Sequence, residues 1–480
     1  MLLALLASCI SPADFGAVPD DRTDDSAAFQ RALDKAIEDR AEVCVGPGVW
    51  NLARPAGRPG SINLIGNLTS NPTSGPVAIR GAGTQTVLRM SGPGHRRDWA
   101  VIYTKNAHDI VIRDLTIDGL DASDTEEQTH LIQLGPGTRD VVISNVTLGP
   151  MRRPDQRVGQ GIGGDCLRLL GEPGHEVAGV VIADSRFVDC DRSGIGFQRA
   201  LRDITVVRDT ITGTGDTAID FEPTGRGTIE DVALVELTIH HPPDAQSAWA
   251  ITLGGIGRDL ASRLLLEQST LDGGGIGMLN VAGVEIADNA ITAHPRDSTR
   301  PTISVIRRGT DIRVVRNTIA RPATSDPGFV IRAAHNNGSV PHDITIEDNT
   351  IVQATPHPVI GSLSVGGLVV RHNVIDYTGG DPSVAIIQAS ADIADIAGLT
   401  VEDNDVRGVA GALVTASPRK DRTLSGVSVH GNRTHDLAAL HCNGPAAGFA
   451  QVSSDQPLPD STGCRGVEVH AITTPTPGTR

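Results

Sequence analysis

Short stretches in which apolar and polar residues alternate recur along most of the chain. The first runs over residues 110–117 and the second over residues 141–148. With a degenerate copy near Arg263 included, the intervals run from roughly 22 to 39 residues and mostly fall near 24 to 32. Such alternation is typical of a β-strand with one buried face. The copies begin at Ile110, Val141, Val180, Ile204, Val232, Val284, Ile312, Ile344, Leu368, Leu399 and Val427.

A second series of short strands lies between these copies. It begins with Leu131-Ile-Gln-Leu and Cys166-Leu-Arg-Leu, and turn residues (Gly, Asp, Asn and Pro) separate the two series. One repeat cannot bury its apolar face alone, whereas stacked repeats can do so in a continuous column. We therefore predict an all-β protein, a parallel β-helix of about twelve coils.

Asparagine recurs near the end of the first strand series in the later coils. Stacked asparagines can hydrogen-bond to one another and to the backbone of turns. We interpret this column as structural rather than as a binding ladder. The earlier coils lack it, and we expect function in that less regular N-terminal half. The column comprises Asn289, Asn317, Asn349, Asn373, Asn404 and Asn432.

The two ends of the chain depart from the repeat. Residues 23–39 begin with acidic side chains and place apolar residues on one helical face, which predicts an α-helix that caps the open end of the β-helix. We expect the β-helix domain to span residues 11–470 and residues 471–480 to form a disordered tail. The apolar helical face consists of Phe29, Leu33, Ala36 and Ile37.

Residues 1–10 form a short apolar segment that we interpret as the end of an export signal. The stretch Leu6-Ala-Ser-Cys9 resembles a bacterial lipobox, in which the cysteine carries a lipid anchor, although no basic residues precede it. The six cysteines fit an exported protein. We expect an extracellular, periplasmic or lipid-anchored protein at the surface of a bacterial cell.

Cysteine spacing gives a disulfide expectation but no zinc pattern. Cys442 and Cys464 flank a segment rich in turn residues, and we expect them to form a disulfide. We expect Cys44, Cys166 and Cys190 to be small buried residues without a disulfide. We assign no metal ion to the cysteines.

Composition excludes two classes of partner. The 480 residues carry a net charge of −16, which argues against binding to the phosphate backbone of a nucleic acid. No apolar run reaches the roughly 18 residues that a membrane span needs. Aromatic residues make up only 2% of the chain, which favours a sugar-stacking role for Trp249, next to an outward strand position.

The N-terminal sequence carries a resemblance to a known superfamily. Residues 13–33, followed by residues 43–52, resemble the motif that opens the fold in pectate-lyase-like proteins. This resemblance implies a right-handed, single-stranded β-helix with a polysaccharide lying across its strands. The superfamily includes polygalacturonase-type glycosidases, polysaccharide lyases, epimerases and phage tail-spike depolymerases. The Gly-His-Gly, Arg-Ile-Lys and Asp-Pro-His-Glu motifs of individual branches are missing, so the resemblance does not select one chemistry.

Outward-facing polar residues of the second series gather between residues 130 and 255. Asp220 and Glu222 are the sharpest pair, because positions i and i+2 of a strand face the same side about 7 Å apart. Their carboxyl groups would lie about 5 to 9 Å apart, which covers the distances of both retaining and inverting glycosidases. We predict one outward column of Gln133, Arg168, Gln198, Asp220 and Thr252.

Further polar residues border this pair. Asp165 and Asp216 precede adjacent strands and are additional carboxylate candidates, and Arg168 is positioned to bind a sugar carboxylate or an oxyanion. Long loops over residues 118–129 and 149–164 are expected to form the walls of a cleft. Residues expected to contact substrate are Gln133, Gln198, Asp216, His241, Trp249 and Arg199.

Three functions remain open on the sequence. The favoured one is an enzyme that hydrolyses glycosidic bonds of a polysaccharide with paired carboxylates and no cofactor. The first alternative is a lyase or C5-epimerase acting on a uronate polymer, with Arg168 as base or charge neutraliser and Ca²⁺ held by carboxylates. The second is a non-catalytic glycan-binding rod or adhesin. A homotrimer is possible in each case.

Overall fold

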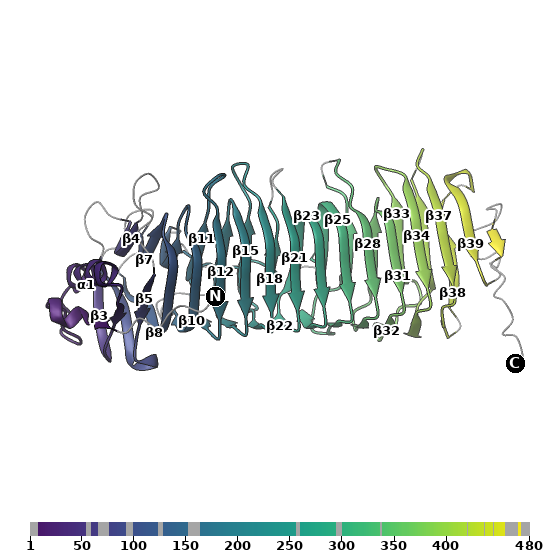
Figure 1. Cartoon of the computed structure of the whole chain (residues 1–480). Helices are drawn as coiled ribbons and strands as arrows, with labels where there is room; N and C mark the ends of the chain where they lie inside the picture. Colours follow the sequence, from purple (N-terminus) through teal and green to yellow (C-terminus); the bar gives the residue numbers. More distant parts are fainter. Residues whose placement is uncertain are drawn as a thin grey trace, which may run out of the picture. The chain divides into compact units, whose positions relative to one another are not determined.

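The computed structural model describes residues 8–53, 59–65, 76–92, 99–122, 128–151, 164–255, 260–293, 300–336, 338–419, 421–435, 437–444, 446–456 and 469–471. The chain is an all-parallel β-solenoid of about 12 turns, with 59% of residues in strands and one helix near the N-terminus (Figure 1). It divides into two compact units, residues 1–262 and residues 263–480. The predicted fold class is confirmed.

The first unit contains α1 (Ser26–Asp39), the 3₁₀ turns η1 (Pro12–Phe15) and η2 (Gly83–Gln85), and the strands up to β20. These strands are β1 (Cys9–Ile10), β2 (Glu42–Cys44), β3 (Gly48–Ala53), β4 (Gly60–Ile65), β5 (Val77–Arg80), β6 (Thr86–Gly92), β7 (Trp99–Lys105), β8 (His108–Ala122), β9 (Thr129–Leu134), β10 (Arg139–Leu148), β11 (Leu167–Leu170), β12 (Val177–Ala183), β13 (Arg186–Val188), β14 (Ile195–Gln198), β15 (Leu201–Val207), β16 (Thr210–Thr212), β17 (Ile219–Glu222), β18 (Ile229–Val235), β19 (Thr238–His240) and β20 (Trp249–Leu253).

The boundary between the units falls within β21 (Ala261–Glu267). The second unit contains η3 (Ala446–Gly448) and the strands β22 (Thr270–Gly273), β23 (Gly275–Ala287), β24 (Ala290–Ala293), β25 (Ile303–Val315), β26 (Thr318–Arg321), β27 (Ile331–Ala334), β28 (His342–Glu347), β29 (Thr350–Gln353), β30 (Ile360–Leu363), β31 (Gly366–Arg371), β32 (Val374–Tyr377), β33 (Ala385–Ala391), β34 (Ile396–Glu402), β35 (Asp405–Gly408), β36 (Ala412–Pro418), β37 (Leu424–His430), β38 (Ala438–Cys442), β39 (Phe449–Ser454) and β40 (Val469–Ala471).

Strand pairing follows the repeat seen in the sequence. In the first unit, Val141 pairs with Ile110 on one side and with Val180 on the other, and Val180 pairs with Ile204. In the second unit, Ile344 pairs with Ile312 and with Leu368 in the same way. Equivalent apolar residues therefore stack coil upon coil in the core of each unit, and alternate side chains point outward.

Helix α1 packs on the N-terminal coils of the first unit, as the amphipathic pattern predicted (Figure 1). Phe29 and Leu33 are buried on its inner face, and the Phe29 ring meets Trp50 of β3 edge-on at 5.6 Å. Asp25 precedes the helix and accepts hydrogen bonds from the backbone N–H groups of Val18 and Asn51. These bonds tie the helix to the turn before it and to β3.

The disulfides differ from those expected. Cys166 pairs with Cys190, and Cys44 pairs with Cys9. The expectation that Cys44, Cys166 and Cys190 lack a disulfide was wrong. Cys166 directly precedes β11 and Cys190 lies in the turn before β14, and because β11 and β14 pair on adjacent coils, the two sulfurs come together. Cys442 is also disulfide-bonded, but its expected partner Cys464 lies outside the described residues.

The N-terminal segment enters the fold earlier than expected. Residues 9 and 10 form β1, which pairs in parallel with β2, so the proposed leader of residues 1–10 overlaps a folded strand. The Cys9 sulfur is engaged in the disulfide with Cys44, and a lipid anchor would need the same sulfur atom. The lipid anchor stays a prediction. A protein that carries it at Cys9 could not form the Cys9–Cys44 disulfide. Of the predicted tail, residues 471–480, Ala471 ends strand β40, and residues 472–480 lie outside the described residues.

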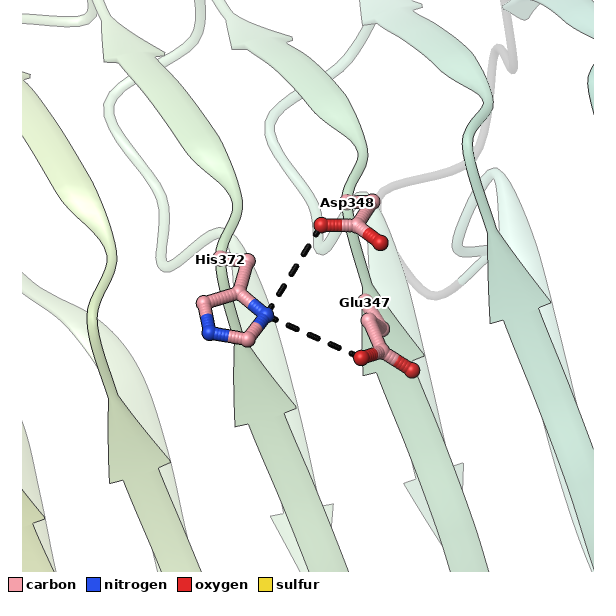
Figure 2. A group of neighbouring side chains, drawn as sticks. All are labelled: Glu347, Asp348 and His372. Carbon is pink, nitrogen blue, oxygen red and sulfur yellow. Dashed lines mark ion pairs between the residues drawn. The ribbon is translucent and has the colours of Figure 1, made fainter.

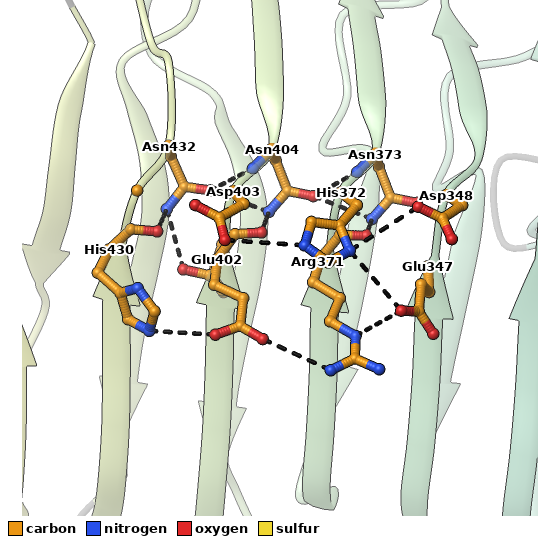
Figure 3. Close-up of polar contacts among 12 residues, drawn as sticks. Glu347, Asp348, Arg371, His372, Asn373, Glu402, Asp403, Asn404, His430 and Asn432 are labelled. Carbon is orange, nitrogen blue, oxygen red and sulfur yellow. Dashed lines mark hydrogen bonds and ion pairs between the residues drawn. The ribbon is translucent and has the colours of Figure 1, made fainter. Parts of the chain in front are cut away.

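The asparagine column of the second unit is a hydrogen-bonded ladder (Figure 3). Asn373 donates from its side-chain nitrogen to the Asn404 side-chain oxygen at 2.9 Å. Asn349 donates to Asn373 in the same way at 3.0 Å. Each amide also donates to backbone carbonyls of its own and the preceding coil. The ladder satisfies the buried turn backbone, which is the structural role inferred from the sequence.

Candidate functional site

A cluster of polar side chains lies on β9, β11, β14, β17 and β20 of the first unit. Strand register places Gln133, Arg168, Gly196, Asp220 and Thr252 in one outward column. The sequence interpretation had put Gln198 there instead of Gly196. That placement was wrong, because the glycine has no side chain to mark the position. Gln198 lies in the next column, beside Glu222.

Asp220 and Glu222 are held together by Arg192. One guanidinium nitrogen of Arg192 lies 2.9 Å from an Asp220 oxygen and 2.5 Å from a Glu222 oxygen. These two oxygens are therefore no more than about 5.4 Å apart. The other Asp220 oxygen accepts a hydrogen bond from Thr252. The sequence pattern correctly placed both carboxylates on one side of β17.

Gln198 extends this network to Arg168. Its amide nitrogen donates to Glu222 at 2.7 Å, and its amide oxygen accepts from the Arg168 Nε at 2.8 Å. Arg168 also contacts Gln128 and the Nε2 of His130. A continuous polar path therefore joins His130, Arg168, Gln198, Glu222, Arg192, Asp220 and Thr252.

Burial varies strongly along this path. His130 and Arg168 are almost fully buried, with 1% and 6% of their surface exposed. The side chains of Asp220 and Arg192 are 13% and 15% exposed, whereas that of Glu222 is 39% exposed. Glu222 is therefore the carboxylate with the greatest access to solvent.

Asp165 lies beneath the cluster and is fully buried. Neither of its carboxyl oxygens has a hydrogen-bond partner, although Arg192 lies 3.8 Å away. A side chain at Gly196 would place its Cβ 2.4 Å from an Asp165 oxygen, so glycine at this position makes room for the carboxyl group. Desolvation by burial raises the pKa of Asp165 to about 6, against the opposing effect of Arg192.

Burial also raises the pKa of Asp220 to about 7, and the nearby Glu222 charge contributes in the same direction. A carboxyl group with this pKa exists in both protonation states at neutral pH. Such perturbed groups gather at functional sites, where proton donors and acceptors are needed. Asp220 is therefore the candidate proton donor of the cluster.

His130 is a member of the cluster that the sequence interpretation missed. Desolvation and the Arg168 charge hold its pKa well below the ordinary value, so the ring is neutral. Its Nδ1 lies 3.1 Å from the Asp165 backbone nitrogen and 3.2 Å from the Asp165 carbonyl oxygen, and its Nε2 lies 3.1 Å from an Arg168 guanidinium nitrogen. Its position at the start of β9, ahead of the outward Gln133, is the signal that could have identified it.

Other predicted residues lie at or outside the edge of this network. Burial raises the pKa of Asp216. The Arg192 charge opposes this shift, and the Glu222 charge adds to it. His241 is buried, and its Nε2 contacts the Ser247 carbonyl rather than a carboxylate of the cluster. The half-buried Trp249 begins β20. Gln133 is 3% exposed, so its side chain is buried rather than presented at the surface.

Arg199 does not join the cluster. It lies in the turn after β14, its side chain is 45% exposed, and it pairs with Glu172 at 3.4 Å. Of the expected cleft walls, residues 118–122 belong to β8 rather than to a loop, and residues 123–127 and 152–163 lie outside the described residues.

One group among the described residues has geometry suitable for a metal ion, and it lies in the second unit (Figure 2). Glu347, Asp348 and His372 bring one ligand atom each within 4.8 Å of one another. Glu347 already pairs with Arg371 at 2.7 Å, and Asp348 and His372 are exposed. In the first unit, Arg192 occupies the space between Asp220 and Glu222, so Ca²⁺ at these carboxylates would have to displace the guanidinium.

No helix in the described part of the chain is both long and apolar enough to cross a membrane.

Several solved structures share the fold. The mannuronan C-5 epimerase AlgE6 A-module of Azotobacter vinelandii is 15% identical, with a TM-score of 0.53 over 93% of this chain and 99% of that one. The tailspike protein of E. coli bacteriophage HK620, solved with a pentasaccharide, is 14% identical, with a TM-score of 0.60 over 90% and 78%. The GH87 α-1,3-glucanase catalytic unit of Streptomyces thermodiastaticus is 18% identical, with a TM-score of 0.50 over 90% and 70%.

No curated protein shows significant sequence similarity to the chain. Residues 10–239 match the model of the family described as rhamnogalacturonase A/epimerase, pectate lyase-like. The match includes the N-terminal motif, the helix and the strands that carry Arg168, Asp220 and Glu222. The chain thus contains a pectate-lyase-like domain within a right-handed parallel β-solenoid.

Proposed function

We propose that the chain is an exported carbohydrate-active enzyme that hydrolyses glycosidic bonds of a polysaccharide at Asp220 and Glu222. The observation that carries this proposal is the pairing of two outward carboxyl groups on one strand, with burial raising the pKa of Asp220 to about 7. A partly protonated carboxylic acid beside a second, more exposed carboxylate is the equipment that glycoside hydrolysis requires.

The roles follow from burial and hydrogen bonding. Asp220 donates a proton to the leaving glycosidic oxygen, because its carboxyl group is the more buried of the two. Glu222 accepts hydrogen bonds from Arg192 and Gln198 and acts as the carboxylate partner. The two oxygens that Arg192 bridges lie at most about 5.4 Å apart, closer than the roughly 6.5–9.5 Å of inverting glycosidases, so we assign the retaining mechanism, in which the second carboxylate attacks the anomeric carbon. Arg192 offsets the repulsion between the two acids.

The test is a panel of polysaccharides incubated with the wild-type protein, Asp220→Asn and Glu222→Gln. New reducing ends that disappear in both variants would support hydrolysis at this pair. Asp203→Asn is the matched control, since this exposed carboxylate of the first unit pairs with Arg202 away from the cluster. The anomeric configuration of the first product, read by proton NMR, is expected to be retained.

Other outcomes of the same panel would replace the proposal. Unsaturated, ultraviolet-absorbing products would indicate a uronate lyase and a central role for Arg168. Uronate inversion without chain cleavage would indicate an epimerase, and loss of activity with a chelator would add Ca²⁺ to either reaction. Binding without turnover would indicate a glycan-binding rod. Full activity in Asp220→Asn would place the chemistry elsewhere.

A further inference from the structure

An aromatic and cationic cluster lies on the second unit, at β27 and β30. The Phe329 ring meets the His357 ring edge-on, with centroids 4.4 Å apart. The Arg332 guanidinium lies over the Phe329 ring at 5.5 Å from its centroid. All three side chains are partly exposed. Aromatic residues make up only 2% of the chain, so a partly exposed phenylalanine beside a histidine and an arginine is an uncommon feature of this surface.

Two fully buried polar side chains hold the turns that carry the rings. Arg321 donates to the backbone carbonyls of Asp326 and Phe329, at 3.0 and 3.2 Å. Gln353, its register partner on the next coil, donates to the carbonyls of Gly328 and His357. Burying a cation and an amide costs free energy unless their hydrogen bonds are made, so these turns are tightly specified. The two rings are thereby pre-positioned.

Strand β30 leaves space for the Phe329 ring. Gly361 pairs with Arg332, and a Cβ at Gly361 would lie 2.6 Å from a Phe329 ring carbon. The next outward position on the following coil is the exposed Gln388. The surface therefore presents, from one coil to the next, a guanidinium, an aromatic ring over a glycine, and an amide.

The charge of Arg332 has no carboxylate counterpart among the described residues. By contrast, Arg316 pairs with Asp288 at 2.7 Å and Arg371 pairs with Glu347 at 2.7 Å in the same unit. Burial alone lowers the pKa of Arg332, but an arginine stays charged at neutral pH. Binding of an anion to a half-buried cation that lacks a carboxylate partner is favourable, because it compensates for the water that the cation has lost.

We propose that Arg332, Phe329 and His357 form a binding subsite for an acidic sugar residue of a polysaccharide. The planar guanidinium matches a sugar carboxylate through two parallel hydrogen bonds. The aromatic rings offer an apolar wall for the C–H face of the same sugar ring. Gln388 can bond a hydroxyl of the neighbouring sugar. The inference rests on the proposed function only in taking a glycan as the ligand.

The experiment is isothermal titration of the full chain with tetragalacturonate and tetramannuronate, in the Asp220→Asn background so that no probe is cleaved. The fully methyl-esterified tetramers are the uncharged controls. We expect the acidic tetramers to bind more tightly than the esters, with affinity that falls as salt is added. Arg332→Gln should weaken binding of an acidic tetramer roughly tenfold or more, and Phe329→Ala should weaken it as well.

Arg316→Gln is the matched control, because it removes an exposed arginine of the same unit that already has a carboxylate partner. The inference would be overturned by equal affinity in Arg332→Gln and Arg316→Gln. It would also be overturned by equal binding of acids and esters, or by no binding of either acid. Thermal unfolding of each variant separates a lost contact from a lost fold.

Failure of the two proposals can be distinguished. If Asp220→Asn cleaves its polymer as well as the wild type but Arg332→Gln loses affinity, the hydrolase site is wrong and the subsite stands. If cleavage depends on Asp220 and acidic tetramers bind independently of Arg332, the hydrolase site stands and the subsite is wrong.

Discussion

Buried polar groups are treated differently in the two units. In the second unit, Asn317 donates to two backbone carbonyls and to the Asn349 oxygen, and accepts from the Asn289 backbone and side chain. In the first unit, Asp165 is equally buried, yet neither carboxyl oxygen has a hydrogen-bond partner. An amide carries both donors and an acceptor and can satisfy its neighbours, whereas a carboxylate can only accept.

Asp209 shows the difference within a single column. It occupies the ladder position in the first unit, where one oxygen accepts from the Ser185 backbone at 2.6 Å and the other has no partner. Burial raises its pKa to about 7. Regular coils thus use amides for stability, while the coils near the site retain carboxyl groups at a cost in stability.

The largest effect on stability is expected from the ladder. Asn349→Ala removes donors to the Val314 and Glu347 carbonyls and leaves Asn317 without its acceptor. Several buried groups lose their partners at about 1–3 kcal/mol each, so we expect a loss of about 4 kcal/mol. Denaturant unfolding measures this loss. Unchanged unfolding would contradict the structural role of the ladder, and polysaccharide turnover should stay normal.

The Cys166–Cys190 disulfide is expected to contribute nearly as much. It closes a loop of 24 residues, for which loop entropy predicts about 3 kcal/mol. Cys166→Ser/Cys190→Ser should therefore unfold at a lower denaturant concentration than the wild type. Thiol counting under denaturing conditions checks the pairing first. Two free thiols from these residues in the wild-type protein would contradict it.

A smaller change in stability, this time a gain, is expected when the carboxyl group at the ladder position of the first unit is replaced by the amide that the second unit uses. Asp209→Asn should stabilise the protein by about 2 kcal/mol at pH 8, because an amide does not incur the cost of burying a charge. The raised pKa of Asp209 means that the folded state loses stability as pH rises from about 4 to about 7. The gain should therefore vanish below about pH 4. An equal gain at pH 3.5 and pH 8 would refute this explanation.

The smallest effect concerns the pH profile of polysaccharide cleavage. The Asp220 carboxyl must be protonated to act as an acid, so the rate should fall above about pH 7. The Arg192 charge lowers the pKa of Asp220. Arg192→Gln should therefore move the alkaline limb upward by about one pH unit, in addition to slowing the reaction. An unshifted limb would show that another group limits the rate.

The repeat was readable from the sequence because the alternation of apolar residues sets strand register directly. Asp220 and Glu222 share a side of β17 for the same reason. The pairing of Cys166 with Cys190 depends on which turns stack, and alternation does not report this. The alternation carries no signal for Arg192, which lies in the turn before β14, whereas the place of His130 near the start of β9 could have identified it. Gln198 was assigned to the column of Asp220, but it pairs with Glu222, two residues further along the strand. Gly196 pairs with Asp220, and without a side chain it gave no sign of this register.

The most direct test measures stability and turnover together for Asp220→Asn at pH 8. If Asp220 is kept for chemistry, the amide should raise the free energy of unfolding by about 1–2 kcal/mol while reducing polysaccharide cleavage at least about a thousandfold. A variant that is less stable than the wild type and retains its turnover would contradict this assignment, and Asp220 would then be a structural carboxyl group.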